Sequence, residues 1–239
     1  MPTFHSFDTT LQPEAGSWTL PGEESHHLSK VLRARCGDTV CILDGNGRKA
    51  VGELTDANPK QAVVKIAEIL EYPKPQPQVC LAVCIPKPKT VETVVRQATE
   101  MGVSEIRLLG SKRSEVPKAF LESPKKSEKL QKIAQEACKQ SENPFLPVIH
   151  MGQPLIEWLE ETPAEGIHWI AHPTRWSQSR FPKPDPSQRK MWILIGAEGG
   201  LTEDEFSLGQ SKGFAPVNLG NTVLRVETAC VAICAKAVF

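Results

Sequence analysis

A glycine-rich stretch near the C-terminus has the composition of a ligand-binding turn. Its sequence, LIGAEGGLTEDEF at residues 194–206, runs from an apolar segment into the expected start of a helix, with Glu198 in the middle. Three glycines flank this acid: Gly196, Gly199 and Gly200. Glycine allows positive φ angles and a close approach of the backbone to a ligand, because it has no Cβ. The stretch therefore predicts a turn that contacts a bound molecule through its backbone.

Glu198 argues against a phosphate as that molecule. The sequence contains neither G-x-x-x-x-G-K-[ST] nor G-x-G-x-x-G, and a carboxylate would repel the anion that a helix N-terminus attracts. A neutral or cationic ligand fits better. An adenosine moiety can stack on apolar side chains and hydrogen-bond to backbone groups, and a sulfonium attached to it would gain from the nearby carboxylate.

A second glycine turn supplies a cation. The segment LGNTVLRVETA, residues 219–229, contains Gly220 and Arg225. Because arginine stays protonated, Arg225 cannot act as a base, but it can stabilise negative charge and position a substrate. The alternative is that Arg225 pairs with Glu227 or with a helix end. Glu227 itself is expected to cap a helix or to pair, without a catalytic role.

Alternating strands and helices are expected to position both turns. Apolar or β-branched runs predict strands at residues 79–85, 105–110, 147–151, 167–172, 191–196 and 215–220. Periodic apolar positions predict helices over residues 89–102, from Ser123 onward and over 227–239. This alternation indicates an α/β layer with a mostly parallel sheet. Ligands bind such sheets at the carboxyl ends of the strands, which is where both glycine turns lie.

Two of these helices carry more specific signals. Thr202 and Glu205 have the T-x-x-E spacing of a capping box, which predicts a helix directly after the first glycine turn. The C-terminal helix, ETACVAICAKAVF, is apolar nearly all round. We expect it to be buried in the core or against a partner subunit.

The first 70 residues have a different character. Short β-rich segments at residues 38–45, 49–56 and 61–70 predict a small β-barrel or β-sandwich. The proline-rich segment YPKPQPQ, residues 72–78, is typical of a stiff linker. We therefore expect two domains, residues 1–72 and residues 73–239.

Composition limits the remaining possibilities. The 239 residues have zero formal net charge, and no apolar run approaches the roughly 20 residues that a membrane helix needs. The N-terminal residues lack the pattern of a secretory signal, so a cytoplasmic location is the expectation. The seven cysteines include no Cys-x-x-Cys pair, and two pairs, Cys80/Cys84 and Cys230/Cys234, lie in apolar runs. Core packing rather than metal binding is predicted for them, and no metal is expected.

Taken together, these motifs resemble the RsmE family of 16S ribosomal RNA uridine-N3 methyltransferases, in the SPOUT superfamily. IGAEGGLTEDEF and LGNTVLRVETA carry the resemblance, with HHLSKVLRARCGD, RQATEMGVSEI and EACKQSENPFLPVI preceding them in order. It covers nearly the whole chain. It implies an N-terminal PUA-like β-barrel that binds RNA and a SPOUT domain with a trefoil knot, an exception to the rule that chains are unknotted. It also implies S-adenosylmethionine as cofactor, small-subunit ribosomal RNA as substrate and a homodimer.

The resemblance assigns residues as well. The implied cofactor-binding residues are Ile195, Gly196, Glu198, Gly199, Gly200, Leu219, Gly220, Val223 and Leu224. The implied RNA-binding residues are Lys30, Arg33, Arg35 and Arg113, for which the alternative is an ordinary solvated surface. The chain departs from the family at Ala197, where proline is usual, and at Gln97, Glu142 and Asn143, near which the family has basic residues.

The implied reaction gives the two charged residues of the turns their expected roles. N3 of uridine attacks well only once deprotonated, when negative charge spreads onto O2 and O4. Arg225 is the expected catalytic cation beside those oxygens. Glu198 could accept the N3 proton, hydrogen-bond a ribose hydroxyl or hold the turn. The alternative to uridine-N3 methylation is a non-catalytic or retargeted SPOUT relative, which binds RNA only or methylates a ribose 2'-hydroxyl or another base.

Overall fold

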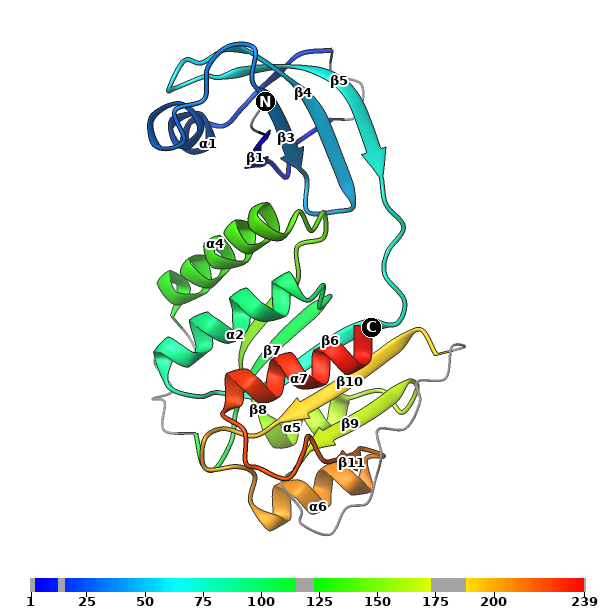
Figure 1. Ribbon diagram of the computed structural model, residues 1–239. Coiled ribbons are helices and arrows are strands. Elements are labelled where there is room, and N and C mark those ends of the chain that lie inside the picture. Colours follow the sequence, from blue (N-terminus) through cyan, green and yellow to red (C-terminus); the bar gives the residue numbers. More distant parts are fainter. Residues whose placement is uncertain (1–2, 13–15, 115–122, 173–187, 239) are drawn as a thin grey trace. The chain divides into compact units, whose positions relative to one another are not determined.

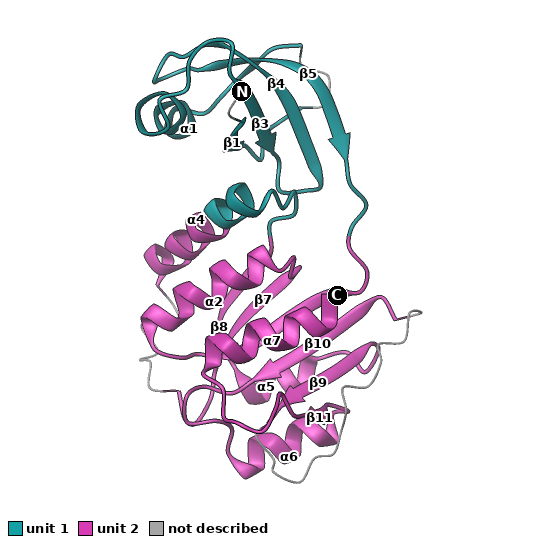
Figure 2. Ribbon diagram, in the orientation of Figure 1, with its two compact units in different colours: residues 1–74, 135–146 teal, residues 75–134, 147–239 magenta. Residues whose placement is uncertain are grey.

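The computed structural model describes residues 3–12, 16–114, 123–172 and 188–238 (Figure 1). It divides into two compact units (Figure 2). Unit 1 contains Met1–Lys74 and Gln135–Leu146, and unit 2 contains Pro75–Ala134 and Pro147–Phe239. The change of unit at Lys74 lies close to the expected boundary at residue 72, but the sequence did not indicate that residues 135–146 join unit 1. The division into domains 1–72 and 73–239 stays a prediction.

Unit 1 is built on a curved five-stranded sheet with the order β1-β3-β4-β5-β2. Its strands are β1 (Thr3–Phe7), β2 (Trp18–Thr19), β3 (Thr39–Leu43), β4 (Arg48–Asp56) and β5 (Val63–Glu71). β1 pairs with β3 in parallel, and the other neighbours are antiparallel. The β4–β5 ladder shifts register between Val51 and Gly52 and again between Leu54 and Asp56. Such irregularities bend strands and increase their twist, and the result is a half-barrel of the expected PUA-like type.

A short helical segment closes one side of this half-barrel. α1 (Gly22–His26) continues into the π-helical turn η1 (His27–Val31), whose Leu28 is buried in the core of unit 1. Two residues after η1, Arg33 has a φ of 58°, a left-handed conformation that is uncommon for a residue with a side chain. The chain therefore reverses sharply at this point, and Ala34 donates its N–H back to Leu28.

Helix α4 (Pro124–Ser141) is divided between the two units. Its C-terminal part belongs to unit 1, where Cys138 packs with Phe7 and Leu43. Lys139 is buried in the same unit, and its ammonium pairs with Glu24 and Glu136. Buried lysine of this kind needs carboxylate partners, because an unpaired buried charge is strongly unfavourable. These contacts explain why residues 135–146 join unit 1.

Unit 2 contains a six-stranded sheet with the order β11-β9-β10-β6-β7-β8. Its strands are β6 (Gln78–Cys84), β7 (Glu105–Gly110), β8 (Val148–Pro154), β9 (Ile167–Ala171), β10 (Lys190–Ile195) and β11 (Ala215–Val217). All neighbouring strands are parallel, which confirms the predicted sheet. Parallel sheets are covered on both faces, and β6 is accordingly buried from Val79 to Cys84.

Helices cover both faces of that sheet (Figure 1). On one side α2 (Pro88–Glu100) packs against α7 (Val226–Val238), which also contacts β6 and β10. On the other side α5 (Leu155–Glu161) contacts β7, β8 and α6 (Glu203–Ser211). The core beneath α5 and α6 includes the large side chains Trp158, Trp192 and Phe214. These layers fix the carboxyl ends of the strands, where the site lies.

Within the described ranges, each helix is too short or too polar to cross a bilayer. All seven cysteines are unpaired, and only Cys36 is exposed. Burial raises the pKa of the Cys84 and Cys234 thiols to about 12, so these two cysteines are packed as neutral groups. The described residues contain no cluster of His, Cys, Asp and Glu side chains that could hold a metal.

Candidate functional site

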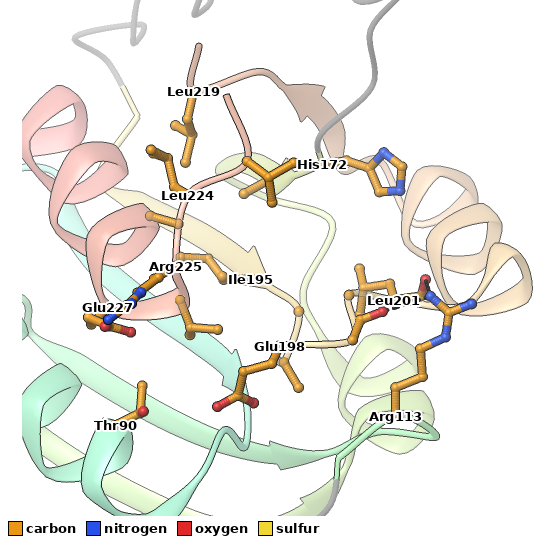
Figure 3. A pocket seen from close by; sticks show the side chains of 18 of the residues that line it. Thr90, Arg113, His172, Ile195, Glu198, Leu201, Leu219, Leu224, Arg225 and Glu227 are labelled. Carbon is orange, nitrogen blue, oxygen red and sulfur yellow. Dashed lines mark hydrogen bonds between the residues drawn. The ribbon is translucent and has the colours of Figure 1, made fainter. Parts of the chain in front are cut away.

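A pocket of about 670 Å³ lies at the carboxyl ends of the unit 2 strands (Figure 3). Its walls come from the segments that follow β9, β10 and β11, from the start of α2 and from Arg113 after β7. This volume is typical of small-molecule sites. The two glycine turns of the sequence, although about twenty residues apart, meet in this one pocket.

The first glycine turn folds back tightly on itself. The Gly200 N–H donates to the Ala197 carbonyl over 2.8 Å, and Gly200 has a φ of 70°. A Cβ at Gly196 would lie 2.9 Å from the carbonyl carbon of Gly200, closer than any side chain permits. Glycine is thus required at both positions, and the pocket wall here is mainly backbone.

Glu198 at the tip of this turn is held by α2. One carboxylate oxygen of Glu198 accepts the backbone N–H of Lys87, the N-cap residue of α2, over 3.0 Å. The side chain is exposed and lines the pocket, as does Thr90 of α2. Figure 3 shows Glu198 extending from the turn toward the start of that helix. Its second oxygen forms no hydrogen bond with the described residues, so a ligand in the pocket can reach it.

Arg225 lies in the second turn, immediately before α7. Its carbonyl accepts the N–H of Ala229 in the first turn of the helix, which fixes the backbone of Arg225. Its guanidinium lines the pocket (Figure 3) and forms no hydrogen bond or ion pair with any described side chain. The alternative expectation, a pair with Glu227, is therefore not present in the described structure. Arg225 therefore has a fixed backbone and a guanidinium that is available to a ligand.

Apolar side chains form the remaining wall. Those expected from the sequence are Ile195, Leu219, Val223 and Leu224, and all of them line the pocket. Val223 is 81% exposed, although it is a large aliphatic residue. Gly220, with a φ of 141°, is next to Leu219 and is not among the described lining residues. Apolar walls with a few polar groups suit a ligand that contains an aromatic ring system.

Arg113 also reaches this pocket. Its Nη1 donates to the carbonyl oxygens of Gly199 at 2.8 Å and Leu201 at 3.0 Å. The neighbouring Lys112 donates its N–H to the buried carboxylate of Glu205 over 2.8 Å. Arg113 is thus engaged with the glycine turn, and its predicted contact with RNA stays a prediction.

His172, which the sequence analysis did not select, follows β9 and lines the pocket. Its ring centroid lies 4.2 Å from that of Phe206, and burial lowers its pKa, so the imidazole is neutral at neutral pH. Nδ1 is buried and has no hydrogen-bond partner among the described residues. The sequence could have identified His172, because this residue ends the predicted strand at residues 167–172 and ligands bind at the carboxyl ends of such strands. Lys87 and Thr90 also line the pocket and follow the predicted strand at residues 79–85, and they were likewise not predicted as site residues.

The other predicted basic residues lie in unit 1. Lys30, Arg33 and Arg35 are exposed on and after η1. The backbone N–H of Arg35 donates to Asp38, which holds the turn that presents them. The three cations therefore form one exposed segment of unit 1, here called the basic turn.

The chain is similar to known proteins over most of its length. A family model described as an RNA methyltransferase domain matches residues 73–238, and one described as an RNA methyltransferase PUA domain matches residues 20–67. The chain is 31% identical over 216 residues to ribosomal RNA small subunit methyltransferase E of Synechocystis, covering 88% of this chain and 69% of that protein.

Two solved structures are also similar. One is that of ribosomal RNA small subunit methyltransferase E from Neisseria gonorrhoeae bound to S-adenosylmethionine, with a TM-score of 0.81, 27% identity and coverage of 98% of this chain and 95% of that one. The other is described as a methyltransferase from Legionella pneumophila with bound S-adenosylmethionine, with a TM-score of 0.85, 27% identity and coverage of 98% and 96%.

Proposed function

Because the chain belongs to the ribosomal RNA small subunit methyltransferase E family, we propose that it methylates N3 of a uridine in small-subunit (16S) ribosomal RNA. It is an S-adenosylmethionine-dependent ribosomal RNA methyltransferase with the knotted SPOUT fold and a PUA-like RNA-binding domain. The observation that carries the proposal is one pocket that has an apolar and backbone wall, the carboxylate of Glu198 and the guanidinium of Arg225, which has no ion-pair partner among the described residues.

The residues of this pocket fit S-adenosylmethionine. Ile195, Leu219 and Leu224 provide apolar surface for the adenine ring, and the glycine turn provides backbone groups. The carboxylate of Glu198, held by Lys87, supplies a negative charge for a sulfonium. When bound, S-adenosylmethionine supplies an electrophilic methyl group. The basic lining residues Lys87, Arg113 and Arg225 are accompanied by the acids Glu198 and Glu227, and Arg113 donates to the glycine turn. The lining therefore does not favour a phosphate over a cationic ligand.

Arg225 is proposed as the catalytic cation. As N3 of uridine loses its proton, negative charge develops on O2 and O4, and a guanidinium fixed beside them stabilises that charge without reorganising. The backbone of Arg225 is fixed by the bond from Ala229, and its side chain forms no ion pair with a described carboxylate. It remains charged at every working pH, so its role is electrostatic and positional.

Glu198 is proposed to act on the cofactor side of the reaction. One of its oxygens is engaged with the Lys87 N–H, which leaves the other to accept a hydrogen bond from a ribose hydroxyl or to face the sulfonium. The N3 proton then leaves to solvent or to this free oxygen. Glu198→Gln, which can keep the bond to Lys87 but lacks the negative charge, tests whether this free oxygen faces the sulfonium.

The RNA is proposed to bind through unit 1 as well as the pocket. The basic turn at Lys30, Arg33 and Arg35 offers three exposed cations for phosphate contacts. A cytoplasmic location is proposed from the substrate, since ribosomal RNA is found there.

A homodimer is proposed from α7. The helix buries one side within unit 2, but further apolar residues on it remain partly exposed: Val231, Ala232, Ala235 and Val238. A second copy of the chain would cover them. Light scattering at micromolar concentration should give twice the monomer mass, and a monomer would contradict the dimer.

The experiment that tests this function measures transfer of labelled methyl groups from S-adenosylmethionine to small ribosomal subunits and to free 16S ribosomal RNA, both prepared from cells that lack the modification. Incorporation into either RNA is expected, and RNA that already carries the modification should take up none. Cofactor binding without incorporation into either substrate would indicate a non-catalytic relative.

A further inference from the structure

We propose that Arg113 is a positioning residue that fixes the shape of the cofactor-binding turn, residues 196–201. The inference rests on the proposed function, since it takes this turn to contact S-adenosylmethionine. It gives Arg113 a role distinct from the RNA contact that the family resemblance implied.

The contacts of Arg113 are made to two separate peptide groups of the turn. Its Nη1 donates to the Gly199 carbonyl at 2.8 Å and to the Leu201 carbonyl at 3.0 Å (Figure 3 shows Arg113 and Leu201). Its aliphatic stem lies against Gly199, where an added Cβ would come within 3.2 Å of the Cβ of Arg113. The guanidinium and the aliphatic stem of Arg113 therefore both contact the same turn.

Each of these two peptide groups is also held at its other end. The peptide that carries the Gly199 carbonyl carries the Gly200 N–H, which donates to Ala197 over 2.8 Å. The peptide that carries the Leu201 carbonyl carries the Thr202 N–H, which donates to Glu205 over 2.8 Å. Because a peptide group is planar, a bond at each end fixes its orientation. Arg113 completes this arrangement for both groups.

The Leu201 N–H lies between the two fixed peptides. It donates to no described residue, and Leu201 lines the pocket. We infer that the fixed peptides on either side set the direction of this N–H and of the turn's inner surface. A cofactor would then meet a backbone that is ordered before binding, which reduces the entropy lost on association.

The backbone of Lys112, next to Arg113, forms a further hydrogen bond to α6, the helix that follows the turn. Lys112 donates its backbone N–H to Oε1 of Glu205 at 2.8 Å, while Oε2 of Glu205 accepts the Thr202 N–H of the capping box. Residues 112 and 113, which follow β7, thus hold both the turn and the start of α6. The lysine side chain contributes only an exposed pair with Asp204 at 3.2 Å.

The chain offers a matched control. Arg113→Ala removes the guanidinium bonds, whereas Lys112→Ala removes the neighbouring exposed charge and keeps the backbone bond to Glu205. Arg113→Lys keeps the charge but loses the planar guanidinium whose Nη1 donates to both carbonyls. The Arg113 side chain is exposed, so none of these variants should prevent folding, which thermal unfolding checks.

Calorimetry should show that Arg113→Ala raises the Kd for S-adenosylmethionine about 10-fold, the scale of losing hydrogen bonds from a charged donor. Arg113→Lys should recover part of this loss, and Lys112→Ala should stay within about 2-fold of wild type. The Kd for RNA, measured without cofactor, should change less than about 2-fold in Arg113→Ala. In the cofactor-free protein, the Gly200 and Thr202 amides should exchange with deuterium at least about 10-fold faster in Arg113→Ala.

Unchanged cofactor affinity together with unchanged amide exchange in Arg113→Ala would overturn the inference. So would a loss of RNA affinity with unchanged cofactor affinity, because Arg113 would then be an RNA contact. Failure of the wild-type protein to bind S-adenosylmethionine would instead refute the proposed function, and the amide exchange would still test the support of the turn.

Discussion

The backbone N–H of Lys87 donates to the carboxylate of Glu198 over 3.0 Å, although 111 residues separate the two in sequence. This bond joins the N-cap of α2 to the tip of the glycine turn. An acid within a glycine turn is therefore partly structural, because it ties two walls of the pocket together. Its remaining oxygen is the one that a ligand can use.

Glu198→Gln should weaken binding of S-adenosylmethionine more than binding of S-adenosylhomocysteine. The amide oxygen of Gln can still accept the Lys87 N–H, so the substitution removes mainly the negative charge. Since only the first ligand carries a sulfonium, we expect its Kd to rise about 5-fold to 10-fold while that of the second rises about 2-fold. Glu198→Ala, which also loses the bond to Lys87, should weaken both. Equal effects of Gln on both ligands in calorimetry would contradict the role in charge recognition.

Arg225→Ala should reduce turnover by roughly 100-fold or more, the usual scale for removing one fixed charge-stabilising group. The Kd for S-adenosylmethionine should stay within about 3-fold, because Arg225 acts on charge that develops in the transition state. Single-turnover methyl transfer and calorimetry measure the two quantities. Equal loss of binding and rate would mean that Arg225 is structural.

Replacing the basic turn should change the salt dependence of RNA binding. With Lys30, Arg33 and Arg35 all changed to alanine, the slope of log Kd against log salt concentration should become shallower by about 2 to 3, because each phosphate that is no longer neutralised reduces it by roughly one. Cofactor affinity is the control and should not change, because these residues do not line the pocket. An unchanged slope in filter binding would exclude this surface from RNA binding.

Lowering the pH below about 6.5 should reduce the free energy of unfolding, at pH values still above those at which carboxylates ordinarily become protonated. Burial lowers the pKa of four histidines: His5, His150, His168 and His172. The unfolded chain then binds more protons than the native one, so the free energy of unfolding falls as pH drops below about 6.5. The hydrogen bond from Lys49 lowers the pKa of Glu142, whose contribution is lost only at more acidic pH, below about 4.5.

Urea unfolding at pH 7.5 and pH 5.5 measures this effect. His168 is the best single test, because it is buried between Trp192 and Phe214. His168→Gln should be less stable at pH 7.5 but should lose less stability between the two pH values than wild type. An equal or larger pH dependence in the variant would contradict the assignment of a buried neutral imidazole.

Local patterns predicted most of unit 2. The strand runs, the helix at residues 89–102 and the capping box of Thr202 and Glu205 correspond to structural elements, and both capping bonds are formed. Such features depend on residues close in sequence, so a single chain suffices to find them. The rule that ligands bind at the carboxyl ends of parallel strands then brought the two glycine turns together.

The features that were missed depend on contacts distant in sequence. No periodicity links Arg113 to Gly199 or Lys87 to Glu198, and both bonds join residues that only the folded sheet brings close. β2 has two residues, too few for an alternating pattern. The sequence pattern predicted the helix that follows Ser123, but it could not show that Cys138 of this helix, α4, packs on Phe7 and Leu43 of unit 1.

The identity of the methylated nucleoside tests the central proposal most directly. Small-subunit ribosomal RNA from a strain without this chain, and from the same strain with it restored, would be digested to nucleosides and compared by mass spectrometry. We predict that N3-methyluridine is absent from the first and restored in the second, and that the Arg225→Ala chain fails to restore it. A 2'-O-methylated nucleoside, another methylated base, or N3-methyluridine in both samples would contradict the proposed reaction.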